Sequence, residues 1–361
     1  MKTFECGNCG QITFFENVVC EHCGMPLGYV PEIRAMVAFQ PGSDLFWSPV
    51  NSTLVERYRP CNNYVTQHIC NWMVAESDQN AWCRSCRFTE MIPALSIPEN
   101  LHRWFLLEVA KRRLIYSLMQ IGLPIPDRDR DPACGLRFKF LADTDTPQEQ
   151  VLTGHQDGVI TLNIDEADDA TRELKRTRMR EPYRTLLGHL RHEVGHFYWQ
   201  HLICESRWLE GFRALFGDER QDYQQSLDHY YATRSSSDWT GAFISEYASA
   251  HSWEDWAETW AHYLHIVDAL DTAANWRARI GSAQPSSPFP EASAPMTIEA
   301  FEAALMRDWM PFTLFLNSMN RSLGQKDSYP FVNPEAVIRK LCFIHQVVLA
   351  ARVESPDARG H

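Results

Sequence analysis

The chain has 361 residues, a hydrophobic fraction of 45% and a formal net charge of −12 at pH 7. This length is enough for one large domain and a smaller one. The acidic balance argues against general nucleic-acid binding, because that function needs a positively charged face. The first residues, MKTFECGNCG, hold no apolar run typical of an export signal, and no apolar stretch reaches the roughly 18 residues of a membrane helix. We therefore expect a soluble, cytoplasmic protein with no membrane partner.

Cysteines are concentrated near the N-terminus, where eight of the eleven lie within the first 86 residues. In a chain without an export signal, clustered cysteines indicate metal sites rather than disulfides. The first four form two Cys-x-x-Cys pairs, each followed by a glycine that tolerates the positive φ of such turns. Ten residues separate the pairs, enough for a short hairpin, so the pattern predicts a closed tetrahedral zinc site. Its predicted ligands are Cys6, Cys9, Cys20 and Cys23.

A second structural zinc site is predicted from the next four cysteines, which are Cys61, Cys70, Cys83 and Cys86. Only Cys83 and Cys86 have the two-residue gap, since eight residues separate Cys61 from Cys70, and His68 could replace one cysteine as ligand. A segment this short has little apolar sequence for a core and would need such ligands to fold. Residues 1–90 are therefore predicted to form a zinc-ribbon region with two zinc ions.

The charge of this zinc-ribbon region decides between two common uses of zinc ribbons. Residues 1–90 hold six lysines and arginines against nine acidic residues, and each four-thiolate site adds negative charge. Because nucleic acids attract basic surfaces, we expect a structural role or protein docking instead. Within this region, the segment QPGSDLFWSPVNS at 40–52 is predicted to be a loop.

The remainder of the chain has the pattern of a mainly helical domain with a small β-sheet. Apolar residues recur at helical spacing from Pro98 until Gly122 and Pro124 end the segment. Residues 135–143 and 158–165 alternate as strands do. Further helices are predicted at 168–180, from Pro182 onward, and at 251–270, 298–318 and 334–353. We place this second domain at 91–353, with a surface loop at 282–295 and a disordered tail at 354–361.

The sequence HEVGH at residues 192–196 has the spacing of a zinc hydrolase site. Residues four apart share one helix face, so His192 and His196 can bind the same ion. Glu193 lies about 100° further around the helix, where it can take a proton from water without binding the metal. Zinc lowers the pKa of bound water to about 7 and polarises a substrate carbonyl, which suits hydrolysis of an amide bond.

A catalytic zinc needs a third protein ligand and an open fourth position. A third histidine in the pattern HExxHxxGxxH is excluded, because Trp199 and Leu202 occupy the relevant positions. The remaining common solution is a glutamate from a later helix. In SWEDWAETWAHYLH, Glu254 and Glu258 lie four residues apart and share a face. We predict Glu254 as the ligand and Glu258 as acceptor of a hydrogen bond from a ligand histidine, with Glu258 as the alternative ligand.

The start and the core face of this later helix can also be predicted. Ser252 is followed three residues on by Asp255, which resembles a capping box at the helix start. The tryptophans of the segment form an apolar stripe that would face the core. Glutamates embedded among tryptophans are therefore expected to be buried rather than solvated.

These two motifs resemble those of the gluzincin metallopeptidases, because 57 residues separate HEVGH from the sequence EDWAE. The closer resemblance is to lethal-factor-like gluzincins, which have a tyrosine seven residues before the ligand glutamate. Tyr247 occupies that position, so the resemblance implies that its hydroxyl stabilises the tetrahedral oxyanion. It also places His265 beside the ligands, and it implies that the strand following His155 borders the cleft. An extended substrate could join the edge of that strand.

Residues 1 to about 350 also resemble the bacterial zinc-binding metallopeptidases that carry an N-terminal zinc-ribbon region. The stretches that carry this resemblance include CGNCG, CEHCG, TGHQDGVITLNIDEAD, RHEVGHFYW and SEYASAHSWEDWAETWAHYLH. The resemblance implies an α+β protein in which a zinc-ribbon region precedes a mainly helical, gluzincin-like catalytic domain with a small β-sheet. It implies one catalytic and two structural zinc ions, and hydrolysis of peptide bonds.

Three functions are consistent with these residues. The first is a zinc metallopeptidase that acts on peptides or proteins. The second is a zinc-dependent amide hydrolase with a non-peptide substrate, which would use the same residues in a closed pocket. The third is a binding or scaffold protein that uses the ribbons and keeps a latent protease fold. The complete set of predicted site residues argues against the third, because a degenerate enzyme would be expected to have lost at least one.

Overall fold

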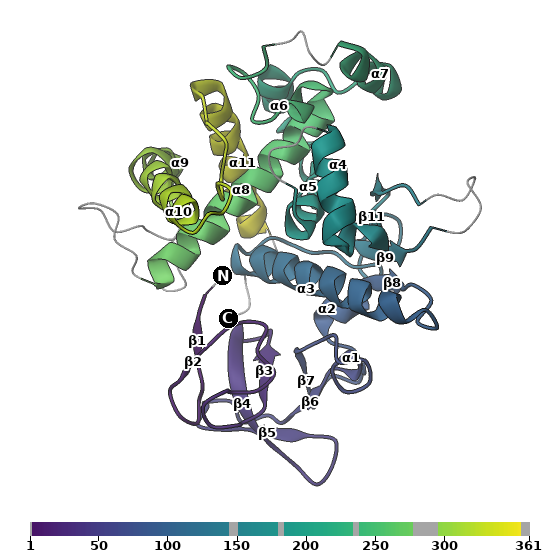
Figure 1. Cartoon of the computed structure of the whole chain (residues 1–361), viewed down its shortest axis with the longest axis vertical. Coiled ribbons are helices and arrows are strands. Elements are labelled where there is room, and N and C mark those ends of the chain that lie inside the picture. The colour runs from purple at the N-terminus through teal and green to yellow at the C-terminus, as the bar shows by residue number, and fades with distance from the viewer. Residues whose placement is uncertain (1, 144–150, 180–183, 234–237, 277–294, 355–361) are drawn as a thin grey trace.

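A sheet-rich region precedes a helix-rich one along the chain, which confirms the predicted α+β class (Figure 1). The computed structural model describes residues 2–143, 151–179, 184–233, 238–276 and 295–354. All but the last residue of the loop predicted at 282–295, and all but the first of the tail predicted at 354–361, lie outside these ranges. None of the helices described is long and apolar enough to cross a membrane.

The N-terminal region is built from short antiparallel strands around two groups of cysteines. Two strands form a first hairpin, β1 (Phe4–Glu5) and β2 (Ile12–Thr13). A five-stranded sheet follows in chain order, with β3 (Leu27–Val30), β4 (Ala35–Pro41), β5 (Trp47–Pro49), β6 (Tyr58–Pro60) and β7 (Met73–Ala75). Two single-turn helices lie beside the second cysteine group, α1 (Asn62–Val65) and α2 (Arg84–Arg87).

The prediction of a loop over residues 40–52 is wrong in part, because β5 and the end of β4 lie within this segment. Pro41 pairs with Trp47 across the two strands. The ring centroid of buried Phe39 lies 6.3 Å from that of Trp47 and 6.0 Å from that of Tyr58. Glycine, proline and serine in this segment indicate a turn locally, but aromatic packing across neighbouring strands stabilises a sheet.

One hydrophobic core joins the N-terminal region to the helical domain. The link is α3 (Pro98–Gln120), which begins and ends where the sequence predicts. The ring centroid of Tyr116 on α3 lies 5.0 Å from that of Phe15 and 5.8 Å from that of Tyr29. Tyr29 in turn packs 4.6 Å from the ring of Trp72. These aromatic rings therefore pack the region that carries the cysteine groups against α3 of the helical domain.

The helical domain contains a four-stranded sheet in the order β10-β11-β9-β8. Its strands are β8 (Thr89–Met91), β9 (Arg137–Leu141), β10 (Gly154–Gln156) and β11 (Val159–Asn163). The strand predicted at 158–165 is thus an inner strand, and its expected free edge is a wrong prediction. Asp157 and Gly158, with φ of 48° and 79°, turn the chain so that His155 lies on the edge strand β10. Asp-Gly is a known hairpin signal, so this turn was readable from the sequence.

Helices make up most of the second domain (Figure 1). They are α4 (Asp169–Met179), α5 (Leu186–Tyr198), α6 (Leu209–Phe216), α7 (Tyr223–Thr233), α8 (Ser252–Asn275), α9 (Ile298–Ala304), α10 (Met310–Ser322) and α11 (Glu335–Glu354). Short turns include η2 (Ile164–Ala167) and η4 (Tyr247–Ser249). The sequence pattern predicts all of these helices except α6 and α7.

The first residues and the N-terminal caps of α5 and α8, which carry the predicted site, differ from those predicted from the sequence. Thr185 caps α5, since its hydroxyl accepts a hydrogen bond from the Gly188 amide at 2.9 Å, so the helix starts after the predicted Pro182. His251 caps α8, because its Nδ1 accepts from the Trp253 amide. The predicted Ser252–Asp255 cap is therefore wrong. The Asp255 carboxylate instead forms a buried ion pair with Lys340 at 2.6 Å.

The helices α5 and α8 cross closely at Gly195. A Cβ atom at this position would lie 2.9 Å from Cα of Ala257 and 3.2 Å from Cβ of Trp260. The indole of Trp256 donates a hydrogen bond to the Gly195 carbonyl at 2.9 Å. Any side chain larger than hydrogen would force the helices apart, because the opposing atom belongs to the backbone. The glycine of HEVGH therefore determines how near α8 comes to the two histidines.

We expect Gly195→Ala to lower the free energy of unfolding by about 1–3 kcal/mol, as overpacking does at a rigid contact. Urea denaturation of zinc-loaded protein would measure it. The matched control is Gly241→Ala, where a Cβ would meet no atom within 4 Å. The control should change stability by no more than about 0.5 kcal/mol. Equal midpoints for the two variants would contradict the close crossing.

Candidate zinc sites and active site

The first four cysteines converge on one point, with all their sulfur atoms within 4.8 Å of one another. Sγ of Cys6 lies 3.7 Å from that of Cys23, and Sγ of Cys9 lies 3.7 Å from that of Cys20. A tetrahedral zinc with Zn–S bonds of about 2.3 Å would separate its sulfurs by about 3.8 Å. The residues present therefore fit a closed zinc site. Two glycines end the turns with φ of 75° and 73°, Gly10 and Gly24.

The second four cysteines converge in the same way. Sγ of Cys70 lies 3.7 Å from that of Cys83 and 3.8 Å from that of Cys86. Backbone amides donate to the sulfurs, including the Cys83 amide to Cys61 at 3.3 Å. Burial and the neighbouring thiols raise the pKa of Cys83, so a cation is needed to stabilise thiolates here. Four cysteines complete the group, so His68 is not needed as a replacement ligand.

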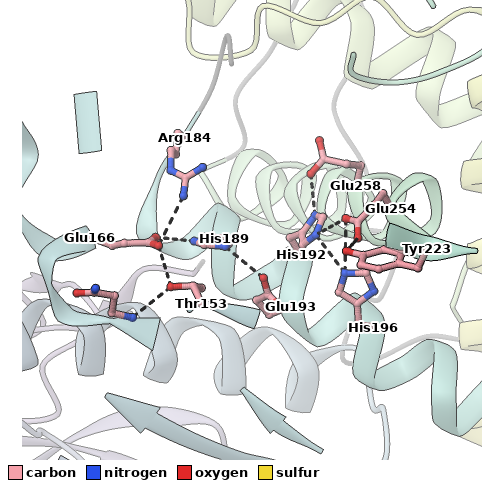
Figure 2. A network of polar contacts seen from close by, with 11 residues as sticks. Thr153, Glu166, Arg184, His189, His192, Glu193, His196, Tyr223, Glu254 and Glu258 are labelled. Carbon is pink, nitrogen blue, oxygen red and sulfur yellow. Dashed lines mark hydrogen bonds and ion pairs between the residues drawn. The ribbon is translucent and has the colours of Figure 1, made fainter. Parts of the chain in front are cut away.

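The third cluster joins α5 and α8 and contains His192, His196 and Glu254 (Figure 2). The two Nε2 atoms lie 3.2 Å apart, and Oε2 of Glu254 lies 3.1 Å from the first and 3.7 Å from the second. A zinc bound at about 2.0–2.1 Å in tetrahedral geometry would space its ligand atoms by about 3.3–3.4 Å. The three side chains therefore have the spacing to hold one zinc ion.

Two of these side chains, His192 and Glu254, are each held by a further residue outside the cluster. The Nδ1–H of His192 donates to Oε1 of Glu258 at 2.7 Å, and the hydroxyl of Ser245 donates to Oε2 of Glu258 at 2.7 Å. Glu258 is therefore the residue that accepts the hydrogen bond from a ligand histidine, and Glu254 is the glutamate that lies in the metal cluster. The hydroxyl of Tyr223 donates to Oε1 of Glu254 at 2.7 Å. Such contacts determine which ring nitrogen and which carboxylate oxygen face the metal position.

Tyr223, which comes from α7, is not among the residues that the sequence pattern predicts for the site. It lies 31 residues before Glu254, and no local motif connects the two. Burial and the Glu254 carboxylate raise the pKa of Tyr223, so it stays a neutral donor. Only the packing of α7 over the site shows this contact.

Glu193 presents its two carboxylate oxygens to different surroundings. Oε1 lies 3.2 Å from Nε2 of His189, one turn earlier on α5. Oε2 is buried and has no hydrogen-bond partner among the residues that the structure describes. Burial opposes ionisation of Glu193, but the imidazoles of His189 and its neighbours outweigh it and lower the pKa of this carboxyl. Glu193 is thus a carboxylate with one oxygen available to accept a proton.

Tyr247 lies in η4, just before α8, and its ring centroid is 6.1 Å from that of His192. Burial and the nearby Glu254 raise its pKa, so its hydroxyl remains protonated and can donate. His155 on the edge strand β10 stacks on His196 at 6.4 Å. Burial and the charge of His196 lower the pKa of His155 to about 4, which keeps it neutral.

His265 does not lie beside the ligands, as the family resemblance implies, but further along α8. It is about three turns along α8 from Glu254, and its Nδ1 lies 2.6 Å from a guanidinium nitrogen of Arg191. Arg191 also pairs with Asp268 of α8. These contacts join α8 to α5, so His265 supports the pairing of the helices through Arg191.

A His–His–Glu cluster in a helical domain, preceded by two four-cysteine groups, places the chain in the class of zinc-binding proteins. The family model described as "Putative zinc-binding metallo-peptidase" matches residues 100–347, and a model described as a zinc-ribbon domain matches residues 3–97. The chain belongs to this metallopeptidase family, which confirms the resemblance to zinc-binding metallopeptidases with an N-terminal zinc-ribbon region.

Three relatives extend the comparison over nearly the whole chain. They are uncharacterized proteins of two strains of Mycobacterium tuberculosis and one of Mycobacterium bovis. Each is 43% identical over 350 residues, which cover 96% of this chain and 95% of the relative. No solved structure matches the chain.

We expect Tyr223→Phe to weaken zinc binding at the His–His–Glu cluster by about 10-fold to 100-fold, because a supporting hydrogen bond to Glu254 is lost. Competition with a chromophoric chelator would measure the affinity. Tyr231→Phe, on the same helix and 52% exposed, is the matched control. Equal zinc affinities for the two variants would show that Tyr223 does not support the site.

Proposed function

We propose that this protein is a zinc-dependent metallopeptidase. The observation that carries the proposal is the cluster of His192, His196 and Glu254, with the carboxylate of Glu193 on the same helix as the two histidines. These three residues would hold a catalytic zinc. The two cysteine groups would hold structural zinc ions, because four sulfur ligands leave no open position for substrate.

A bound zinc would supply a water of lowered pKa and polarise the scissile carbonyl. Oε2 of Glu193 accepts a proton from the attacking water and passes it to the leaving nitrogen. The neutral hydroxyl of Tyr247 donates a hydrogen bond to the oxyanion that develops on the substrate. Glu258 holds the proton on Nδ1 of His192, so Nε2 keeps its lone pair for the metal.

The edge strand β10 supports a peptide as substrate rather than a compact amide. Among the strands that the structure describes, β10 pairs with β11 alone, and His155 places it beside His196. An extended peptide can add to such an edge through backbone hydrogen bonds. Docking of a protein partner on the zinc-ribbon region, a cytoplasmic location and the domain boundaries at residues 90 and 353 stay predictions.

Glu193→Gln should lower the rate of peptide hydrolysis by about 10²-fold to 10⁴-fold, the usual contribution of a general base. Zinc content should not change, because the substituted side chain is not a ligand. A mixed peptide library analysed by mass spectrometry would provide the substrates. Glu210→Gln, at an exposed site on α6, is the control and should keep full activity. Full activity of Glu193→Gln would exclude the mechanism, and cleavage only of non-peptide amides would favour the alternative hydrolase.

Purified protein should contain three zinc ions per chain, one for each cluster. His192→Ala should contain two, because only the His–His–Glu cluster loses a ligand. Inductively coupled plasma mass spectrometry against protein concentration would measure this. A wild-type content of one zinc would contradict the two cysteine sites, and an unchanged content in His192→Ala would contradict the third.

A further inference from the structure

We propose that His189 and Glu166 are positioning residues that hold the carboxylate of Glu193 by Oε1 and leave Oε2 for the attacking water. This role rests on the proposed function, in which Glu193 is the general base. Neither residue is a member of the three metal clusters. Figure 2 shows His189 between the carboxylates of Glu166 and Glu193.

The imidazole of His189 bridges two carboxylates with its two ring nitrogens. Nε2 lies 3.2 Å from Oε1 of Glu193, and Nδ1 lies 2.5 Å from Oε2 of Glu166. A neutral imidazole has one N–H and one lone pair, so it could donate to only one of them. An imidazolium donates to both, and hydrogen bonds between charged groups are shorter and stronger than neutral ones. Both ring nitrogens face a carboxylate oxygen, and two carboxylates beside one imidazole favour its charged form.

Glu166 is itself anchored, so it can act as a fixed support. Its side chain is 3% exposed and comes from η2, which follows β11. The hydroxyl of Thr153 donates to its Oε1 at 3.0 Å, and the guanidinium of Arg184 lies 3.6 Å from the same atom. Its backbone carbonyl accepts from Arg172 at 2.8 Å. A buried carboxylate with these partners has little freedom to rotate.

Because Glu166 holds His189 in place, His189 can in turn restrict the rotation of the Glu193 carboxylate. His189 and Glu193 are four residues apart on α5 and therefore lie on one face. Glu166, which follows β11 of the sheet, thus orients the carboxylate of Glu193 on α5 through His189. The two carboxylate oxygens of Glu254 are also used differently, because Tyr223 donates a hydrogen bond to Oε1 and Oε2 faces the two histidines. A misplacement of about 1 Å at a reacting group can cost about 10²-fold in rate, so such support matters for catalysis.

The test compares His189→Ala, Glu166→Ala and the double variant with wild-type protein on a peptide that wild type cleaves. Each single variant should lower kcat by about 10-fold to 100-fold with KM changed less than about twofold and zinc content unchanged. The double variant should lose no more than either single one, because the residues act as a unit. His189→Gln, which can still donate to Glu193, should recover part of kcat. His102→Ala, at an exposed site on α3, is the control.

A readout that does not depend on activity is nitrogen-15 NMR of the zinc-loaded protein. Both ring nitrogens of His189 should be protonated at pH 7.5 in wild type, and Glu166→Ala should lose the second proton. A neutral His189 in wild type, or a wild-type kcat in His189→Ala while Glu193→Gln is inactive, would overturn the positioning role alone. Additive losses in the double variant would also overturn it. No cleavage by wild type of any peptide would overturn the proposed function and this role with it.

Discussion

The close crossing of α5 and α8 at Gly195 is the constraint on which the candidate site depends. Because glycine has no side chain, the backbone at Ala257 can approach the HEVGH helix, and Trp256 bonds to its carbonyl. The first turn of α8 then brings Glu254 within 3.1 Å of Nε2 of His192. Buried tryptophans on α8 supply the apolar area that holds the helices together. The metal cluster is thus a consequence of helix packing.

Burying carboxylates in this packed region is costly unless each is hydrogen-bonded. Ser245 and His192 bind Glu258, Tyr223 binds Glu254, and His189 lies against Glu193. Those partners come from separate parts of the chain, so the site draws its order from the whole helical domain. In Glu254 and Glu193 the supported oxygen is Oε1, and Oε2 stays available for the metal position or for a proton. The chemistry proposed here uses the oxygens that the protein leaves unoccupied.

The zinc-ribbon region is connected to this arrangement by packing. The rings of Phe15 and Tyr29 rest against Tyr116 of α3, and α3 packs in turn against α5. Sulfur spacings of 3.7–3.8 Å fit tetrahedral zinc in both cysteine groups. A metal that orders such a short segment contributes directly to its folding. The region therefore stabilises one face of the domain that carries the candidate site.

The sequence by itself determined the features that are local in the chain. Cys-x-x-Cys spacing, the face shared by His192 and His196, and the pairing of Glu254 with Glu258 follow from turn and helix periodicity, so the clusters could be predicted. Tertiary structure alone decided that Tyr223 reaches Glu254, that Glu166 meets His189, and that His265 lies against Arg191. It also decided the strand pairing within 40–52 and the cap of α8. The contacts of Tyr223, Glu166 and His265 join distant segments, and their partners are selected by packing and burial, which no short-range periodicity records.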